Sequence, residues 1–108
     1  MMNEAKRKVL QELGGIPEEV YDELVRDLFA QMDDLIVKLE SALGTADYKT
    51  IGDISHSIKG SSANLRIHPV YELARSIELA AKEKKTAEEI EKNLKMLEQV
   101  CAERGGTV

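Results

Sequence analysis

The chain has no tryptophan, one cysteine and two prolines, and aromatic residues make up only 4% of it. The single cysteine, Cys101, cannot form a disulfide within the chain, which suits a reducing cytosol. No apolar run is long enough to cross a membrane, and the charged N-terminal segment lacks the apolar core of a signal peptide. No basic run with interleaved aromatic residues appears either. We therefore expect a cytoplasmic protein without a membrane or nucleic-acid partner.

The residues that are abundant favour helices. Of 108 residues, 43% are hydrophobic, and alanine, leucine, glutamate and lysine are frequent. This length supports one core but not two. Fifteen basic and twenty acidic side chains give a net charge of −5, and no strand pattern, internal repeat or low-complexity segment is present. The composition predicts a single all-α domain.

Glycine and proline mark the helices of the N-terminal half. A short helix within residues 3–13 is predicted to end at Gly14-Gly15, with Ala5, Val9 and Leu13 on one side. Pro17 fits the first position of a long second helix, which Gly44 would close. The apolar stripe of this helix comprises Leu24, Leu28, Met32, Leu35 and Leu39.

Capping residues mark the remaining helices. Thr45 or Asp47 would begin the third helix, and residues 67–69 break the chain because Pro69 fits a helix start. A basic cluster at residues 82–85 marks the end of the fourth helix, and Thr86 would cap the fifth. The apolar stripes of these last two helices comprise Val70, Leu73, Ala74, Ile77 and Ala81, and Ile90, Leu94, Leu97 and Cys101.

Four long helices joined by short linkers predict an antiparallel up-down-up-down four-helix bundle over residues 17–104. Residues 1–15 would add an accessory N-terminal helix and linker, and residues 105–108 a flexible tail. A helical hairpin that completes its core by dimerising is the alternative. The apolar stripes suffice to cover one another within one chain, so we expect a monomer.

The stretch of residues 46–66 places one histidine apart from its apolar side chains. At about 100° per residue, His56 falls opposite the apolar stripe and points to solvent. Its helical neighbours include Gly52, Gly60 and Ala63, and an interior glycine costs a helix about 1 kcal/mol relative to alanine. Small residues around an exposed imidazole predict a face that another protein approaches closely. The stripe itself comprises Ile51, Ile54, Ile58 and Leu65, with Ser55 and Ser62 on the same side.

An exposed imidazole can act as a nucleophile at neutral pH, taking a phosphoryl group on its nitrogen and giving it back. Phosphoryl transfer needs mainly positioning and neutralisation of charge on the phosphoryl oxygens. Lys59, one turn after His56, is placed to supply that positive charge. We therefore interpret His56 as a phosphoacceptor and Lys59 as the residue that stabilises the phosphoryl charge.

Residues 56–65 closely resemble the H-x-[LI]-K-G-S-[SA]-x-x-[LI] motif of histidine phosphotransfer (HPt) domains, and residues 73–78 are similar to the family's L-[AC]-x-x-[LI]-E segment. The resemblance covers residues 17–104. It implies a four-helix bundle that carries a phosphoryl group between receiver-domain aspartates in a His-Asp phosphorelay. It also implies phosphorylation of His56, support from Lys59, and room for the partner at Gly60.

One position departs from the family pattern. Ten positions after the histidine, where family members usually have glycine, this chain has Arg66. We expect this change to affect the bend or the docking surface at that end of the helix and to leave the chemistry of His56 unchanged.

No nucleotide-binding loop is present, so the phosphoryl group must come from another protein. We expect response-regulator receiver domains, a hybrid histidine kinase, or both as partners. We expect no cofactor in this chain, with Mg²⁺ held by the receiver. Arg66, Arg75 and Lys82 are candidates for steering an acidic receiver. Two alternatives are a helical adaptor that binds without transfer and the phosphoacceptor portion of a larger chemotaxis-type kinase.

Overall fold

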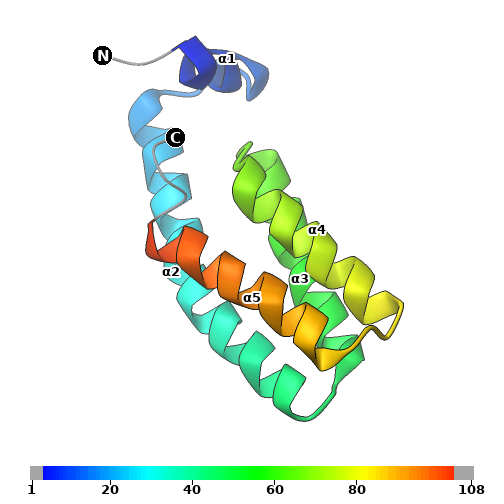
Figure 1. The fold of residues 1–108 in the computed structure, drawn as a ribbon. Helices are drawn as coiled ribbons and strands as arrows, with labels where there is room; N and C mark the ends of the chain where they lie inside the picture. Colours follow the sequence, from blue (N-terminus) through cyan, green and yellow to red (C-terminus); the bar gives the residue numbers. More distant parts are fainter. Residues whose placement is uncertain (1–3, 104–108) are drawn as a thin grey trace.

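A computed structural model of the chain describes residues 4–103, and within that range it is all helical, without strands (Figure 1). The N-terminal helix was predicted within residues 3–13, and its first residue lies outside the described range, as does the predicted tail at 105–108. No helix of the described range combines the length and apolarity that crossing a membrane requires. The helices are α1 (Glu4–Glu12), α2 (Glu18–Gly44), α3 (Tyr48–Asn64), α4 (His68–Lys82) and α5 (Ala87–Ala102).

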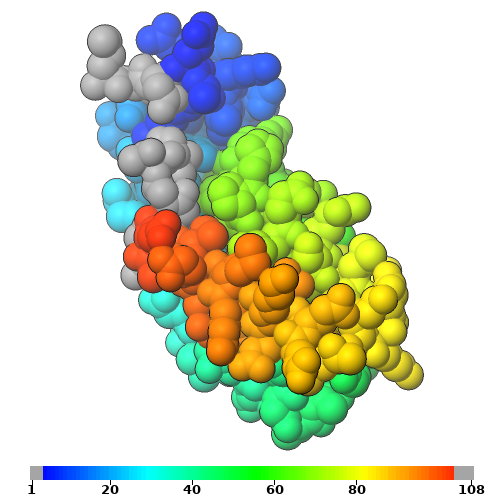
Figure 2. Space-filling view, viewed as in Figure 1, coloured from blue at the N-terminus to red at the C-terminus, as the bar shows by residue number. Residues whose placement is uncertain are grey.

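The four long helices pack in chain order around one core. Each of α2, α3 and α4 packs against the helix that follows it, and α5 returns to pack against α2. The α3–α4 pair is the most extensive of these contacts. Figure 2 shows α4 and α5 side by side on one face and α1 at one end of the molecule, which measures 44 × 22 × 16 Å. The site described below lies on the edge formed by α3 and α4.

Side-chain caps fix the starts of α3 and α5. The Asp47 carboxylate accepts a hydrogen bond from the Thr50 amide at 3.1 Å, which decides between the two predicted starts of α3. Thr86 likewise accepts from the Glu89 amide, as predicted. Pro17 is the N-cap of α2, because its ψ of 148° is extended, so its predicted helical position was wrong by one residue.

The helix ends use left-handed residues that are mostly not glycine. Gly14 and Gly15, both with positive φ, end α1 as predicted. Gly44, predicted to close α2, is instead its last helical residue, and Ala46 adopts the left-handed conformation with φ 54°. Arg66 and Lys84 do the same after α3 and α4, with φ 60° and 52°. A side chain in this region costs about 1 kcal/mol relative to glycine.

Two of the predicted apolar stripes shift in the structure. Leu24 of the predicted α2 stripe is 43% exposed, whereas Tyr21 is fully buried, its hydroxyl donating to the carbonyl of Leu65, the residue that follows α3. In α1, Leu10 is buried and Ala5 is exposed. Which faces of α1 and α2 are buried therefore depends on contacts with other parts of the chain. The periodicity of each segment alone did not predict that Tyr21 and Leu10 are buried. The α4 and α5 stripes are confirmed, apart from a half-buried Leu73.

Candidate functional site

Helix α3 turns two isoleucines and two serines inward and His56 outward. Ile51 and Ile58 are fully buried, and the His56 side chain is 70% exposed, as the periodicity predicted. Ser55 and Ser62 are buried too, and their hydroxyls donate to backbone carbonyls one turn earlier, at Ile51 and Ile58. These serines are small and carry their own hydrogen-bond partners, so α4 can pack closely against α3 without an unsatisfied polar group.

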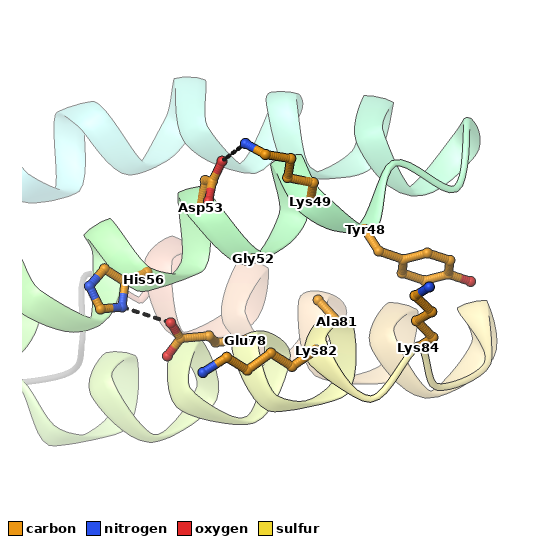
Figure 3. A pocket seen from close by; sticks show the side chains of 9 residues that line it. All are labelled: Tyr48, Lys49, Gly52, Asp53, His56, Glu78, Ala81, Lys82 and Lys84. Carbon is orange, nitrogen blue, oxygen red and sulfur yellow. Dashed lines mark hydrogen bonds and ion pairs between the residues drawn. The ribbon is translucent and has the colours of Figure 1, made fainter.

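Glu78 of α4 connects the two residues predicted to carry the chemistry. Its Oε2 lies 2.7 Å from Nδ1 of His56, and its Oε1 lies 2.6 Å from Nζ of Lys59. The Glu78 side chain is only 13% exposed, compared with 29% for Lys59 and 70% for His56. Figure 3 shows the imidazole reaching across from α3 to the Glu78 carboxylate on α4. His56 is therefore oriented by a carboxylate, in contrast to the free-standing histidine that the sequence suggested.

The charge of Glu78 determines the tautomer of His56. The Lys59 ammonium, and after it the His56 ring, hold the pKa of the Glu78 carboxyl below its ordinary value despite the opposing effect of burial. An ionised carboxylate can only accept a hydrogen bond, so the proton of a neutral His56 lies on Nδ1. The lone pair then lies on Nε2, the nitrogen on the solvent side of the ring. The arrangement thus leaves the lone pair of Nε2 accessible from solvent.

The predicted docking positions surround His56 differently. A Cβ added at Gly60 would meet nothing within 4 Å, so packing within the chain does not require glycine there. A Cβ added at Gly52 would lie 4.0 Å from the Cβ of Ala81, at the closely packed surface between α3 and α4. Ala63 is half-buried. The open space at Gly60 fits a position that an incoming partner fills, and this role remains a proposal for all three residues.

A shallow groove runs from His56 along the α3–α4 edge (Figure 3). Gly52 and Ala81 lie along it between His56 at one end and the start of α3 at the other. Charged side chains stand on both of its sides. Its lining comprises Tyr48, Lys49, Gly52, Asp53, His56, Glu78, Ala81, Lys82 and Lys84.

Arg66, the departure from the family pattern, is held by the chain itself. Its guanidinium donates to the carbonyls of Ala63 and Asn64 at 2.9 and 3.1 Å, and its Nε lies 3.3 Å from Glu12 of α1. The same residue supplies the left-handed turn in which a glycine would be unstrained. Arg66 therefore closes α3 and connects it to α1, and these contacts leave it less available for steering a partner.

Glu78 is the site residue that sequence reasoning missed. It is the glutamate that ends the segment of residues 73–78, which resembles the family pattern, but it lies 22 positions from His56 in the sequence. Only the packing of α3 against α4 brings the two side chains together. The remaining histidine, His68, is exposed away from this cluster, and Cys101 is buried. Among residues 4–103, no three His, Cys, Asp or Glu side chains are grouped to hold a metal ion.

An exposed, carboxylate-oriented histidine with a lysine beside it, on a packed pair of helices, is an arrangement that can carry a phosphoryl group. The family model described as "Hpt domain" matches residues 23–103, and the chain belongs to that family. It is accordingly a histidine phosphotransfer module of phosphorelay signalling, as the sequence motif predicted. Comparisons with curated proteins and with solved structures give no significant match.

Proposed function

We propose that His56 accepts a phosphoryl group from a phospho-aspartate on a receiver domain and passes it to the aspartate of a second receiver. The observation that carries this proposal is the contact between Nδ1 of His56 and the Glu78 carboxylate, which directs Nε2 to solvent. Family membership supports the same class of chemistry. The residues and the route of transfer are our assignment.

In the forward step the Nε2 lone pair attacks the phosphorus of the aspartyl phosphate. The N–P bond forms as the P–O bond to the aspartate breaks, and the partner's carboxylate leaves with the electron pair. The proton stays on Nδ1, so the phosphorylated ring carries a positive charge beside the Glu78 carboxylate, 2.7 Å away. Attack by a second receiver's carboxylate oxygen reverses the sequence, forming the new P–O bond and restoring the neutral imidazole.

Lys59 is proposed to stabilise the phosphoryl oxygens. Its ammonium already lies in the cluster, 2.6 Å from Glu78, and part of the side chain remains exposed. An ammonium has three donors, so Lys59 can keep its bond to Glu78 and still donate to an incoming oxygen. We further propose that Gly52, Gly60 and Ala63 form the surface that admits the partner, because their small side chains leave the imidazole accessible.

Magnesium and the original phosphoryl donor are proposed to come from the partner proteins. A receiver brings an acidic pocket suited to Mg²⁺, and a hybrid histidine kinase would carry such a receiver. We propose that the protein acts as a cytoplasmic monomer. The order of helix contacts, α2–α3–α4–α5 and back to α2, supports an antiparallel up-down-up-down bundle as its finer fold.

The assignment of His56 can be tested without a partner. Wild type, His56→Gln and His68→Gln are incubated with phosphoramidate and weighed as intact proteins, before and after acid treatment. Because His68 is the other histidine of the chain and is also exposed, its variant controls for histidine content. We expect one acid-labile phosphoryl adduct on wild type and His68→Gln and none on His56→Gln.

An adduct that persists in His56→Gln would refute the assignment. No adduct on folded, helical wild type would favour the adaptor that binds without transfer. A positive result leads to a screen of receiver domains, each phosphorylated with acetyl phosphate and Mg²⁺. Transfer to wild type from one of them identifies a partner.

A further inference from the structure

The groove beside His56 carries positive charge in an acidic protein. Lys82 and Lys84 stand on its α4 side, and neither has an ion-pair partner among residues 4–103. On the α3 side, Lys49 lies 3.2 Å from Asp53, but both side chains are largely exposed and such a pair contributes little. The second acidic group at the groove, Glu78, is already paired with His56 and Lys59. The groove therefore has uncompensated positive charge although the chain is −5 overall.

The opposite edge of the molecule has the opposite charge. The groove between α2 and α5 is lined by Glu40, Glu91 and Glu98, with Lys95 as its only basic residue. Lys95 itself lies 3.5 Å from Glu91. A negatively charged protein is thus repelled from one edge and attracted to the other. The attractive edge is the one that contains His56.

The floor of the lysine groove is small and apolar. Gly52 and Ala81 face each other across the α3–α4 contact, and Tyr48 lies at the end away from His56 (Figure 3). The backbone also fixes Lys84. It occupies the left-handed position after α4, where its amide donates to the Ala81 carbonyl at 3.2 Å. The turn between α4 and α5 therefore places the backbone of Lys84 beside the groove.

We propose that this groove docks an acidic segment of the receiver partner, with the segment's carboxylates at Lys82 and Lys84 and a small apolar side chain on the floor of Gly52 and Ala81. The partner's phospho-aspartate then lies at the His56 end of the groove, within reach of Nε2 on the solvent side of the ring. This inference rests on the proposed function, and charge complementarity selects the occupant. A receiver brings clustered carboxylates with its Mg²⁺ site, so its active face meets positive charge next to the imidazole.

A pair of charge-reversed variants tests the proposal. Lys82→Glu/Lys84→Glu alters the groove, and Lys38→Glu/Lys92→Glu alters two exposed lysines on α2 and α5 and has the same net charge. The probe is the receiver domain that transfers to wild type in the screen above. Each protein is also labelled with phosphoramidate, which requires no docking. Circular dichroism confirms that each variant is helical.

We expect the groove variant to lose about tenfold or more in the second-order rate of transfer from the receiver, and the control to stay within about twofold of wild type. Phosphoramidate labelling should be the same in all three proteins, and the salt dependence of transfer should weaken only in the groove variant. Unchanged transfer in the groove variant, or equal losses in both variants, would overturn the docking proposal. So would slower phosphoramidate labelling of the groove variant. Wild type that takes no label from phosphoramidate would overturn the proposed function itself.

Discussion

The two interhelical edges of this protein hold the same type of side chain in opposite environments. On the α3–α4 edge, Glu78 lies between Lys59 and His56, and these two groups lower its pKa. On the α2–α5 edge, a hydrogen bond with Glu40, together with burial, raises the pKa of Glu98. One carboxyl group is therefore kept ionised by its neighbours, while the other is pushed toward its protonated form.

This difference bears on the phosphoryl transfer that we propose for the α3–α4 edge. In the proposed transfer, a carboxylate that stays ionised orients the imidazole and compensates the positive ring of the phosphorylated histidine. The pair of Glu40 and Glu98 offers no comparable partner, and it repels anions. The two edges also differ in charge: the charged residues that line the edge beside His56 are mainly basic, and those that line the far edge are mainly acidic.

Replacing Glu78 should produce the largest effect. In Glu78→Gln the side chain keeps its shape but loses its charge, and its amide can donate to Nδ1, which moves the ring proton to Nε2 and removes the nucleophilic lone pair. We expect phosphoramidate labelling of His56 to slow by about tenfold or more. Glu98→Gln serves as the matched control and should label at the wild-type rate. Equal labelling of Glu78→Gln and wild type would show that the carboxylate does not orient the ring.

The same two variants should change stability in opposite directions with pH. The lowered pKa of Glu78 means that its stabilising contribution is present above its ordinary value of 4.5 and is lost as the pH falls through the folded-state pKa. The raised pKa of Glu98 means that its ionisation increasingly destabilises the fold as the pH rises above 4.5. At neutral pH we expect Glu78→Gln to lose about 1–2 kcal/mol and Glu98→Gln to gain about 0.5 kcal/mol.

Urea unfolding of the two variants and wild type between pH 3 and 8 would measure these differences. The deficit of Glu78→Gln should shrink toward low pH, and the advantage of Glu98→Gln should vanish there. If the two variants followed parallel pH profiles, the contrast between the edges would be wrong.

The smallest effects concern the turns at one end of the helices. Ala46 and Lys84 both adopt left-handed backbone conformations, so glycine at either position relieves strain, and after the entropy that glycine adds to the unfolded chain we expect a gain of about 0.5 kcal/mol. Lys84→Gly also removes a groove charge, whereas Ala46→Gly does not. Transfer from the receiver should therefore slow severalfold in Lys84→Gly alone. Thermal unfolding and transfer rates measure both effects, and equal transfer by the two variants would count against a role for Lys84.

The types of side chain at the site could largely be predicted from the sequence, but the contacts between them could not. Helical periodicity placed His56 outward and Ile51 and Ile58 inward, because the 3.6-residue repeat depends only on local geometry. It could not predict that Glu78 would contact both His56 and Lys59, since that contact depends on how α4 packs on α3. The charge of the groove likewise requires residues from both helices. Arg66 shows the same limit, because its contact with Glu12 of α1 joins residues 54 positions apart.

At the helix ends, the sequence predicted some features and missed others. Capping chemistry is local, so Thr86 and the glycines after α1 were predicted correctly. The left-handed turns at Ala46, Arg66 and Lys84 contain no glycine, and only the requirement that successive helices return onto one core places the reversal there. The sequence by itself determined the helices, the inward faces of α4 and α5 and the exposed histidine, because these follow from the order of side chains along one segment. Only the tertiary structure decided which carboxylate orients that histidine and which edge carries positive charge, because both depend on contacts between separate helices.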